Sequence, residues 1–350
     1  MSDALGHFKA CLLRSCSPIE SISRLVSIEK ETKGRLAFKE TVRVVNQPFL
    51  IGTSGYSYPG PPPNGWFGAF YPKPKPKHFD ELHYYSQIFN TVEINSTFYR
   101  PPSTTTTTAW AKKTSSDFTF AVKLWQKFTH PVKIGRKKSD EKWQPPTQDD
   151  VDQFRTGLEP IAEAGKLGAL LLQYPASFHC TPENMERVER TLQLFYEYPK
   201  VVELRHNTWT EQSAQIKVLL EGNRASSVLI DEPKFSSSIR QDLETIGEIF
   251  YFRAHGRNAK AWWRPKESWE RYDYLYSRQE IKKIAERIDS ATSAPGIKKG
   301  FAFFNNHARA NAAANAIMLS QELGLRPKAM PGEAMIAKFP EIANVERRST

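Results

Sequence analysis

Cysteine is scarce in this chain, with three residues among 350. Cys11 and Cys16 lie near the N-terminus and Cys180 lies far from both, so the sequence offers neither a disulfide framework nor a paired CxxC metal motif. This scarcity indicates a protein of a reducing compartment.

Long apolar segments are also missing. No run approaches the roughly 18 consecutive apolar residues that a membrane-spanning helix needs, and the opening stretch lacks the apolar core of a secretory signal. The first 24 residues carry basic side chains together with Asp3 and Glu20, a mixture that does not favour a mitochondrial presequence. We expect an intracellular, cytoplasmic protein with no membrane partner, and we leave a mitochondrial or nuclear location open.

Acidic residues are outnumbered by basic ones. The chain has 49 Lys and Arg against 38 Asp and Glu, a formal net charge of +11. Such a surplus favours anionic partners, either a small-molecule substrate or nucleic acid, without identifying one.

Eight short apolar or β-branched runs recur along the chain and predict strands. They cover 50–55, 91–97, 119–124, 169–175, 201–206, 226–231, 250–256 and 300–306. Segments with helical character lie between most of them, at 79–89, 105–114, 151–168, 183–198, 213–223 and 277–290, with a last one at 311–324. Strands that alternate with helices are typical of parallel βαβ units. Eight of them predict a TIM (β/α)₈ barrel, whose typical length of about 250 residues fits this span.

An open doubly wound sheet is the structural alternative. That fold usually carries a glycine-rich phosphate-binding turn after an early strand, and GTSGYSYPG at 52–60 matches that pattern poorly. We therefore expect an α/β protein with a single barrel domain at 50–325. Residues 1–49 would form an N-terminal extension that could be partly disordered, and residues 326–350 an irregular C-terminal tail.

Polar side chains recur on one face of seven predicted strands, near their C-terminal ends. The residues that share this face are Glu93 and Asn95, Ala121 and Lys123, Leu171 and Gln173, Glu203 and Arg205, Leu229 and Asp231, Tyr251, Arg253 and His255, and Phe303 and Asn305. Alternate strand residues face the interior of a barrel, and barrel enzymes keep their active sites at this end. The pattern predicts a polar cup that closes the top of the barrel. A structural salt-bridge network is the alternative.

The cup has the residue types of an acid/base site. The candidate catalytic residues are Glu93, Glu203, His255, His130 and Asp231. A carboxylate, Glu93 or Glu203, would be the general base, and a histidine the partner acid. His130, in the loop FTHPV, reads equally well as an ordinary loop histidine.

Cations in the cup are expected to hold an anionic group or a developing oxyanion. These are Lys123, Arg205 and Arg253. A divalent metal bound by Glu93, Glu203, Asp231 and His255 is an alternative. The three cations would repel such an ion, and no HExxH pair is present. An acid/base site without a metal ion is therefore the favoured hypothesis, and the sequence identifies no cofactor.

Three predicted loops at the same end of the barrel are basic. They hold Lys73, Lys75 and Lys77, the stretch 133–143, and the stretch 256–277. Aromatic residues interleave with the charges, at Trp66, Phe67, Trp143, Trp262, Trp263, Trp269, Tyr272 and Tyr274. This combination suits stacking and phosphate contact with single-stranded nucleic acid or nucleotides. Solvated loops whose tryptophans pack against the barrel are the alternative.

Several motifs together resemble the domain of unknown function 72 family, the YecE-like proteins. They include GTSGYSYPG, FNTVEINSTFYR, KLGALLLQYP, VELRHNTW, FRAHGR, YLYS and FAFFNNHARANAAANA, and they run from Ile51 to Gly324. The resemblance implies a TIM barrel and no established reaction. This chain differs mildly from the family pattern at Thr208, where the family usually has serine before the tryptophan. The candidate ligand-binding residues, most of them motif positions, are Asn95, Tyr99, Lys123, Gln173, Arg205, Arg253, Asn305, Asn306 and Tyr274.

Two functions follow as hypotheses. The first is a hydrolase, lyase or isomerase that performs acid/base chemistry on a phosphorylated or carboxylated compound in the cup. The second is a nucleic-acid or nucleotide-binding protein that uses the basic, aromatic loops. A scaffold whose cup is purely structural is a third reading, which the density of ionisable groups disfavours.

Overall fold

The computed structural model describes residues 48–133, 141–241, 245–325 and 327–343. Most of the predicted N-terminal extension therefore lies outside the described residues, as does the greater part of the basic stretch 133–143. None of the helices in the described ranges is long and apolar enough to cross a membrane.

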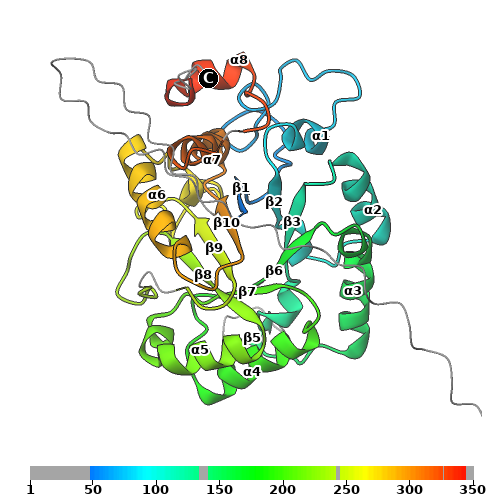
Figure 1. Cartoon of the computed structure of the whole chain (residues 1–350), viewed down its shortest axis with the longest axis vertical. Helices are drawn as coiled ribbons and strands as arrows, with labels where there is room; N and C mark the ends of the chain where they lie inside the picture. The colour runs from blue at the N-terminus through cyan, green and yellow to red at the C-terminus, as the bar shows by residue number, and fades with distance from the viewer. Residues whose placement is uncertain (1–47, 134–140, 242–244, 326, 344–350) are drawn as a thin grey trace, which may run out of the picture. The chain divides into compact units, whose positions relative to one another are not determined.

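Eight parallel strands form a nearly closed barrel, which confirms the predicted fold (Figure 1). They are β1 (Phe49–Thr53), β2 (Thr91–Ile94), β3 (Thr119–Lys123), β6 (Leu167–Gln173), β7 (Lys200–Glu203), β8 (Ala225–Asp231), β9 (Ile249–Ala254) and β10 (Lys299–Phe304). Their order is β1-β10-β9-β8-β7-β6-β3-β2. Each strand coincides with one of the predicted apolar runs to within a few residues. Two-residue strands β4 (Val132–Lys133) and β5 (Glu141–Lys142) form a small hairpin after β3.

Helices connect most of the strands. They are α1 (Glu81–Ser86), α2 (Thr104–Lys113), α3 (Gln148–Glu163), α4 (Pro182–Leu194), α5 (Ser213–Gly222), α6 (Arg278–Thr292) and α7 (Asn311–Glu322). Short 3₁₀ turns include η1 (Ser96–Phe98), η2 (Gln126–Phe128), η4 (Asn207–Gln212) and η5 (Glu270–Tyr272). The connection from β8 to β9 contains no helix in its described residues, so the strand-helix alternation is broken there.

The predicted irregular tail differs from the structure. It contains a short helix, α8 (Glu333–Lys338), and a 3₁₀ turn, η7 (Pro340–Ile342). Met335, Phe339 and Ile342 are buried in the same apolar cluster as the barrel. Arg278 of α6 donates to the carbonyl of Glu341, which ties the tail to the helix layer. Apolar residues among the prolines thus let this segment pack.

The barrel closes between β1 and β2 with few direct strand contacts. Ser54 and Glu93 form a single parallel bridge. The hydroxyl of Tyr85 accepts from Thr53 N at 2.9 Å and donates to Thr91 O at 3.0 Å, which joins the two strands through a side chain. A Cβ on Gly52 would lie 2.3 Å from the Thr91 carbonyl oxygen, so glycine permits this close approach.

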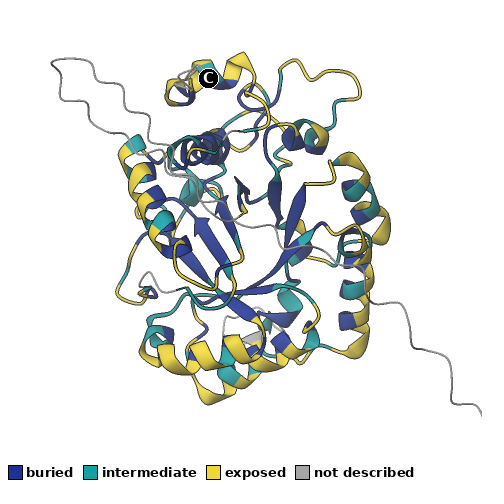
Figure 2. Ribbon diagram, in the orientation of Figure 1, coloured by how far each residue is buried: buried dark blue, intermediate teal, exposed yellow. Residues whose placement is uncertain are grey.

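Local sequence signals position the helices that cover the barrel. Ser277 and Glu280 form a reciprocal capping box at the start of α6, and Thr147 and Asp150 form another at α3. The barrel strands are mostly buried, and most of the helices expose their outer faces, whereas α7 is buried along nearly its whole length (Figure 2). Such burial on both faces explains why the strands are near-continuous apolar runs.

Candidate functional site

Arg253, at the end of β9, lies at the centre of the cup. Its Nη2 donates to Glu93 Oε1 at 2.6 Å, and its Nη1 donates to Glu203 Oε2 at 2.5 Å. Arg253 is 1% exposed, and both carboxylates are fully buried. The guanidinium therefore joins β2, β7 and β9 through two buried ion pairs, which form the floor of the cup.

Two neutral side chains complete this floor. Tyr251, two residues before Arg253 on the same inner face, donates its hydroxyl to Glu93 Oε2 at 2.7 Å. Gln173, at the end of β6, accepts from Arg253 Nη1 at 3.3 Å. Both oxygens of Glu93 are thus satisfied, which a buried carboxylate requires.

Arg205 forms the second layer, closer to solvent. Its side chain is 17% exposed, and its Nη2 lies 3.0 Å from Glu232 Oε2. Its Nε lies 2.9 Å from Glu203 Oε1, an ion pair without hydrogen-bond alignment. Glu203 is therefore shared between two arginines, and Glu232 holds the outer one.

His255 packs beneath Arg205. Its Nε2 lies 3.1 Å from Arg205 Nη2, and its Nδ1 lies 3.0 Å from the side-chain amide of Asn305, which follows β10. Burial, together with the charges of Arg205 and Arg253, lowers the pKa of His255 to about 3. A ring that stays neutral beside two arginines is a poor proton donor, so its predicted role as an acid gains no support from this geometry.

The predicted role of Glu203 as a base is also weakly supported. Burial alone would raise the pKa of Glu203, but the charges of Arg253 and Arg205 outweigh it and hold the pKa well below its usual value. A carboxylate that holds its charge this firmly accepts a proton poorly near neutral pH. Burial, by contrast, raises the pKa of Glu232.

Lys123, at the end of β3, is the remaining cation of the cup. Its Nζ lies over the ring of Phe98 at 3.9 Å from the centroid. Burial, then the charge of Arg253, lowers its pKa to about 7. His130 packs edge-on against the same Phe98 ring, and burial with the charge of Lys123 lowers the pKa of that histidine to about 4.

The prediction that Asp231 faces the cup is wrong. The register pairs Ile230 with Arg253 and Asp231 with Ala254, so Asp231 points to the outer face of the barrel. There it accepts from both Arg257 and the hydroxyl of Tyr276. The next residue, Glu232, contacts Arg205 in its place.

Three candidate ligand-binding residues also lie away from these contacts. Tyr99 is 71% exposed and packs edge-on against Phe98. Asn306 is fully buried and donates to the Tyr274 carbonyl and to Asn315 of α7, which fixes the backbone before α6. The hydroxyl of Tyr274 donates to Glu280. Asn95 is half-buried, and its Oδ1 has no hydrogen-bond partner in the described part of the chain.

The aromatic residues of the rim are mostly packed. Trp66 is fully buried, and Trp262 is 7% exposed with its edge toward His255. Of the eight predicted rim aromatics, each of which lies in a described range, only Trp263 is exposed, at 59%. Lys73, Lys75 and Lys77 are exposed as expected. The tryptophans therefore agree mainly with the packed alternative.

The hypothetical metal ligands do not converge. Asp231 lies on the outer face, while Glu93 and Glu203 bind Arg253. Within the described ranges, no group of three or more His, Cys, Asp or Glu side chains is arranged to hold a metal ion.

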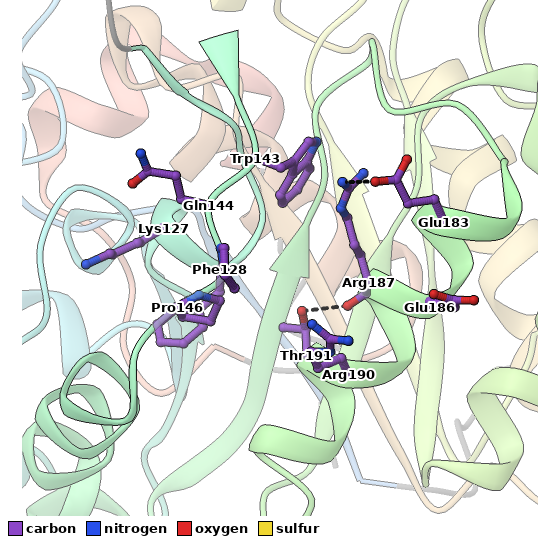
Figure 3. A pocket seen from close by; sticks show the side chains of 11 residues that line it. Lys127, Phe128, Trp143, Gln144, Pro146, Glu183, Glu186, Arg187, Arg190 and Thr191 are labelled. Carbon is purple, nitrogen blue, oxygen red and sulfur yellow. Dashed lines mark hydrogen bonds and ion pairs between the residues drawn. The ribbon is translucent and has the colours of Figure 1, made fainter.

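Three cavities open on other faces of the barrel. One of about 260 Å³ lies between η2, the segment before α3, and α4 (Figure 3). Its Arg187 stacks 4.9 Å from the Trp143 ring centroid and also binds Glu183, so this arginine is already paired. One of about 420 Å³ lies beside α5 and β8, and one of about 850 Å³ lies at the opposite end of the barrel from the cup. None of these three cavities is lined by the buried ion pairs of the cup.

Sequence reasoning missed one member of the cup, Glu232, and gave no role to another. It placed Tyr251 on the inner face, but within the apolar run FYF no local signal marks the hydroxyl as a partner of Glu93. Glu232 follows Asp231 directly, and a sequence DE at a strand end gives two opposite choices of face.

Comparison with known proteins gives one family. The family model described as "Protein of unknown function DUF72" matches residues 50–340. The UPF0759 protein YunF of Bacillus subtilis (strain 168) is 27% identical over 279 residues, which cover 75% of this chain and 96% of YunF. The UPF0759 protein YecE of Escherichia coli (strain K12) is 28% identical over 142 residues, which cover 40% of this chain and 47% of YecE.

Solved structures of similar proteins agree. A DUF72 family protein from Thermotoga maritima MSB8 superimposes with a TM-score of 0.64 at 31% identity, covering 79% of this chain and all of that one. One from Enterococcus faecalis V583 has a TM-score of 0.66 at 23% identity, covering 81% of this chain and 99% of that one. At its lower identity, the second likeness supports the fold alone.

Proposed function

Since this chain belongs to the DUF72 family, whose description assigns no reaction, we propose from its site that it is an enzyme that performs acid/base chemistry on a small anionic substrate in the cup. The observation that carries the proposal is the cluster of buried ion pairs among Glu93, Glu203, Arg253 and Arg205 at the C-terminal end of the strands. Buried charges are costly to keep, and perturbed ionisable groups concentrate at functional sites.

The two layers of the cup suit different roles. In the floor, Glu93 and Glu203 hold Arg253 in one orientation, which positions the layer above. Arg205, which remains partly open to solvent, binds the anionic group of the substrate through charge-assisted hydrogen bonds. The carboxylates thus serve better as positioning residues than as the base that their residue type suggested.

Lys123 suits the proton-transfer role. With a pKa of about 7, it exchanges a proton near neutral pH, where a general base or acid is most effective. It lies on the inner face of β3, where the charges of Arg253, Glu203 and Glu93 all act on it.

Anion binding in the cup can be tested with inorganic phosphate and oxalate. We expect the Arg205→Gln variant to bind them about ten-fold or more weakly, as the loss of a charge-assisted hydrogen bond predicts. Arg190→Gln is the matched control, because Arg190 is an exposed arginine of the outer cavity near α4. Equal weakening by both variants, or by neither, would contradict an anion site in the cup.

Catalysis needs a separate measurement. Phosphorylated and carboxylated compounds are incubated with the protein in D₂O, and ¹H NMR records conversion or loss of C–H signal by exchange with solvent. The proposal expects activity that Lys123→Met removes. Activity that survives this substitution would exclude Lys123 as the proton-transfer group.

A nucleic-acid-binding role is the alternative. Exposed Lys73, Lys75 and Lys77 and the exposed ring of Trp263 favour it, although one exposed ring provides little stacking surface. Binding through phosphate contacts must weaken steeply with salt. Affinity for single-stranded oligonucleotides that stays constant between low and physiological ionic strength would argue against this role.

A further inference from the structure

Lys123 differs from the two arginines of the cup in having no anionic partner. Each arginine lies against two carboxylates, whereas Lys123 Nζ makes no hydrogen bond or ion pair with any residue that the structure describes. Its Nζ lies over the face of the Phe98 ring, 3.9 Å from the ring centroid. The amine is therefore held in place by a ring, with its bonding positions left available.

The surroundings of Lys123 favour the neutral amine. Burial and the neighbouring cations lower its pKa to about 7, so near pH 7 about half of the molecules carry a free lone pair. The charged and titratable groups that act on it or face it are Glu93 from β2, His130 from the loop after η2, Glu203 and Arg205 from β7 and the residues after it, and Arg253 from β9. Desolvated lysines beside other cations are the usual amine nucleophiles of enzymes.

We propose that Lys123 is a nucleophile that forms an imine with an aldehyde or ketone group of the anionic substrate, while Arg205 binds the anionic group. This inference rests on the proposed function, because it uses the same substrate position in the cup. It narrows the substrate class to carbonyl compounds that carry a carboxylate or phosphate.

The covalent step balances without any redox partner. The Nζ lone pair attacks the carbonyl carbon, and the electron pair of the C=O π bond moves to oxygen. One N–H proton passes to that oxygen and gives a carbinolamine. The second N–H proton leaves with the hydroxyl group as water, while the nitrogen lone pair forms the C=N bond.

Lys200 provides an internal reference. It is fully buried, and burial lowers its pKa to about 8. Its Nζ, however, donates to the carbonyls of Tyr196 and Tyr198 at the N-terminal end of β7, away from the cup. A perturbed lysine without access to the cup should therefore not react.

Reductive trapping tests the proposal. The full-length protein is treated briefly at pH 7 with glyoxylate and sodium cyanoborohydride, which reduces an imine to a stable secondary amine. Peptide mapping then gives the rate of carboxymethylation at each lysine. We expect Lys123 to be labelled about ten-fold or more faster than exposed Lys112, because far more of it is unprotonated, and Lys200 to remain unlabelled. Labelling of Lys123 at or below the rate of Lys112 would overturn the proposal.

Variants separate this inference from the function on which it rests. Lys123→Arg keeps a cation at this position and should abolish the fast label. If that variant does not fold, the labelling rates of Lys123 and Lys112 in the wild-type protein still test the proposal. Arg205→Gln should slow labelling by glyoxylate but not by neutral propionaldehyde. Fast labelling of Lys123 by both aldehydes in Arg205→Gln would support the imine and contradict the anion site. Phosphate binding that depends on Arg205, with no fast label, would overturn the imine and leave the proposed function intact.

Discussion

Arg253 donates from Nη2 to Oε1 of Glu93 at 2.6 Å, across the interior of the barrel and between residues 160 positions apart. This pair and its counterpart at Glu203 join three strands of the barrel through buried charges. Their energetic role can be measured independently of any substrate.

Replacing Arg253 with Met should destabilise the fold strongly. Two buried carboxylates would lose their shared cation, and removing one partner of a buried pair costs about 3–5 kcal/mol. Urea denaturation gives the free energy of unfolding, with exposed Arg190→Met as the control. The triple variant that adds Glu93→Gln and Glu203→Gln should recover part of the loss. A loss below about 1 kcal/mol for the single variant would show that the pair contributes little.

His255 should make stability fall in mild acid. Its folded pKa of about 3 lies below the ordinary value of 6.5, so the unfolded state takes up the proton first as the pH drops. Between these two values the unfolded state binds more protons, and the contribution of the neutral ring is lost progressively below pH 6.5. At pH 4 the loss should be about 3 kcal/mol. The difference in unfolding free energy between wild type and His255→Asn, followed from pH 7 to pH 4, measures it, and a difference that stays constant would contradict the neutral buried ring.

Substitution of Asp231 should change stability but not phosphate affinity, whereas substitution of Glu232 should change phosphate affinity. Asp231→Asn removes contacts to Arg257 and Tyr276 outside the cup, so stability should fall by about 1–3 kcal/mol while phosphate affinity stays unchanged. Glu232→Gln removes a negative charge 3.0 Å from Arg205, so phosphate should bind several-fold more tightly. Calorimetric titration of both variants decides this. Tighter phosphate binding by Asp231→Asn would contradict the placement of Asp231 on the outer face of the barrel.

Barrel closure depends on Gly52. In Gly52→Ala the new Cβ would meet the Thr91 carbonyl oxygen, and overpacking of this kind costs about 1–3 kcal/mol or more. Gly222, at the end of α5, is the matched control because nothing lies within 4 Å of its Cβ position. Gly222→Ala should be neutral or stabilising by up to about 1 kcal/mol. Equal melting temperatures for the two variants would contradict a tight junction between β1 and β2.

The family could be predicted from the ordered motifs. All eight strands could be predicted because strands buried on both faces must be apolar, and such runs are visible in the local sequence. Alternation also predicted that Glu93, Lys123, Glu203 and Arg253 share the inner face. It failed at β8, where Val228, Leu229 and Ile230 are apolar on both faces and only the register with β9 decides which side faces inward. Asn306 lies just after β10 and Tyr274 just before α6, in segments where no periodicity applies and only tertiary contacts place the side chain.

The pairing of β1 with β10 joins residue 49 to residue 300. During synthesis at roughly 5–20 residues per second, the first strand must wait between roughly 10 and 50 seconds for its neighbour to emerge from the ribosome. Throughout that interval β1 is an apolar edge with unpaired backbone groups, able to pair with another nascent chain. Closure of the barrel therefore competes with aggregation until β10 has been synthesised. Expression conditions that slow elongation should lower the yield of folded protein.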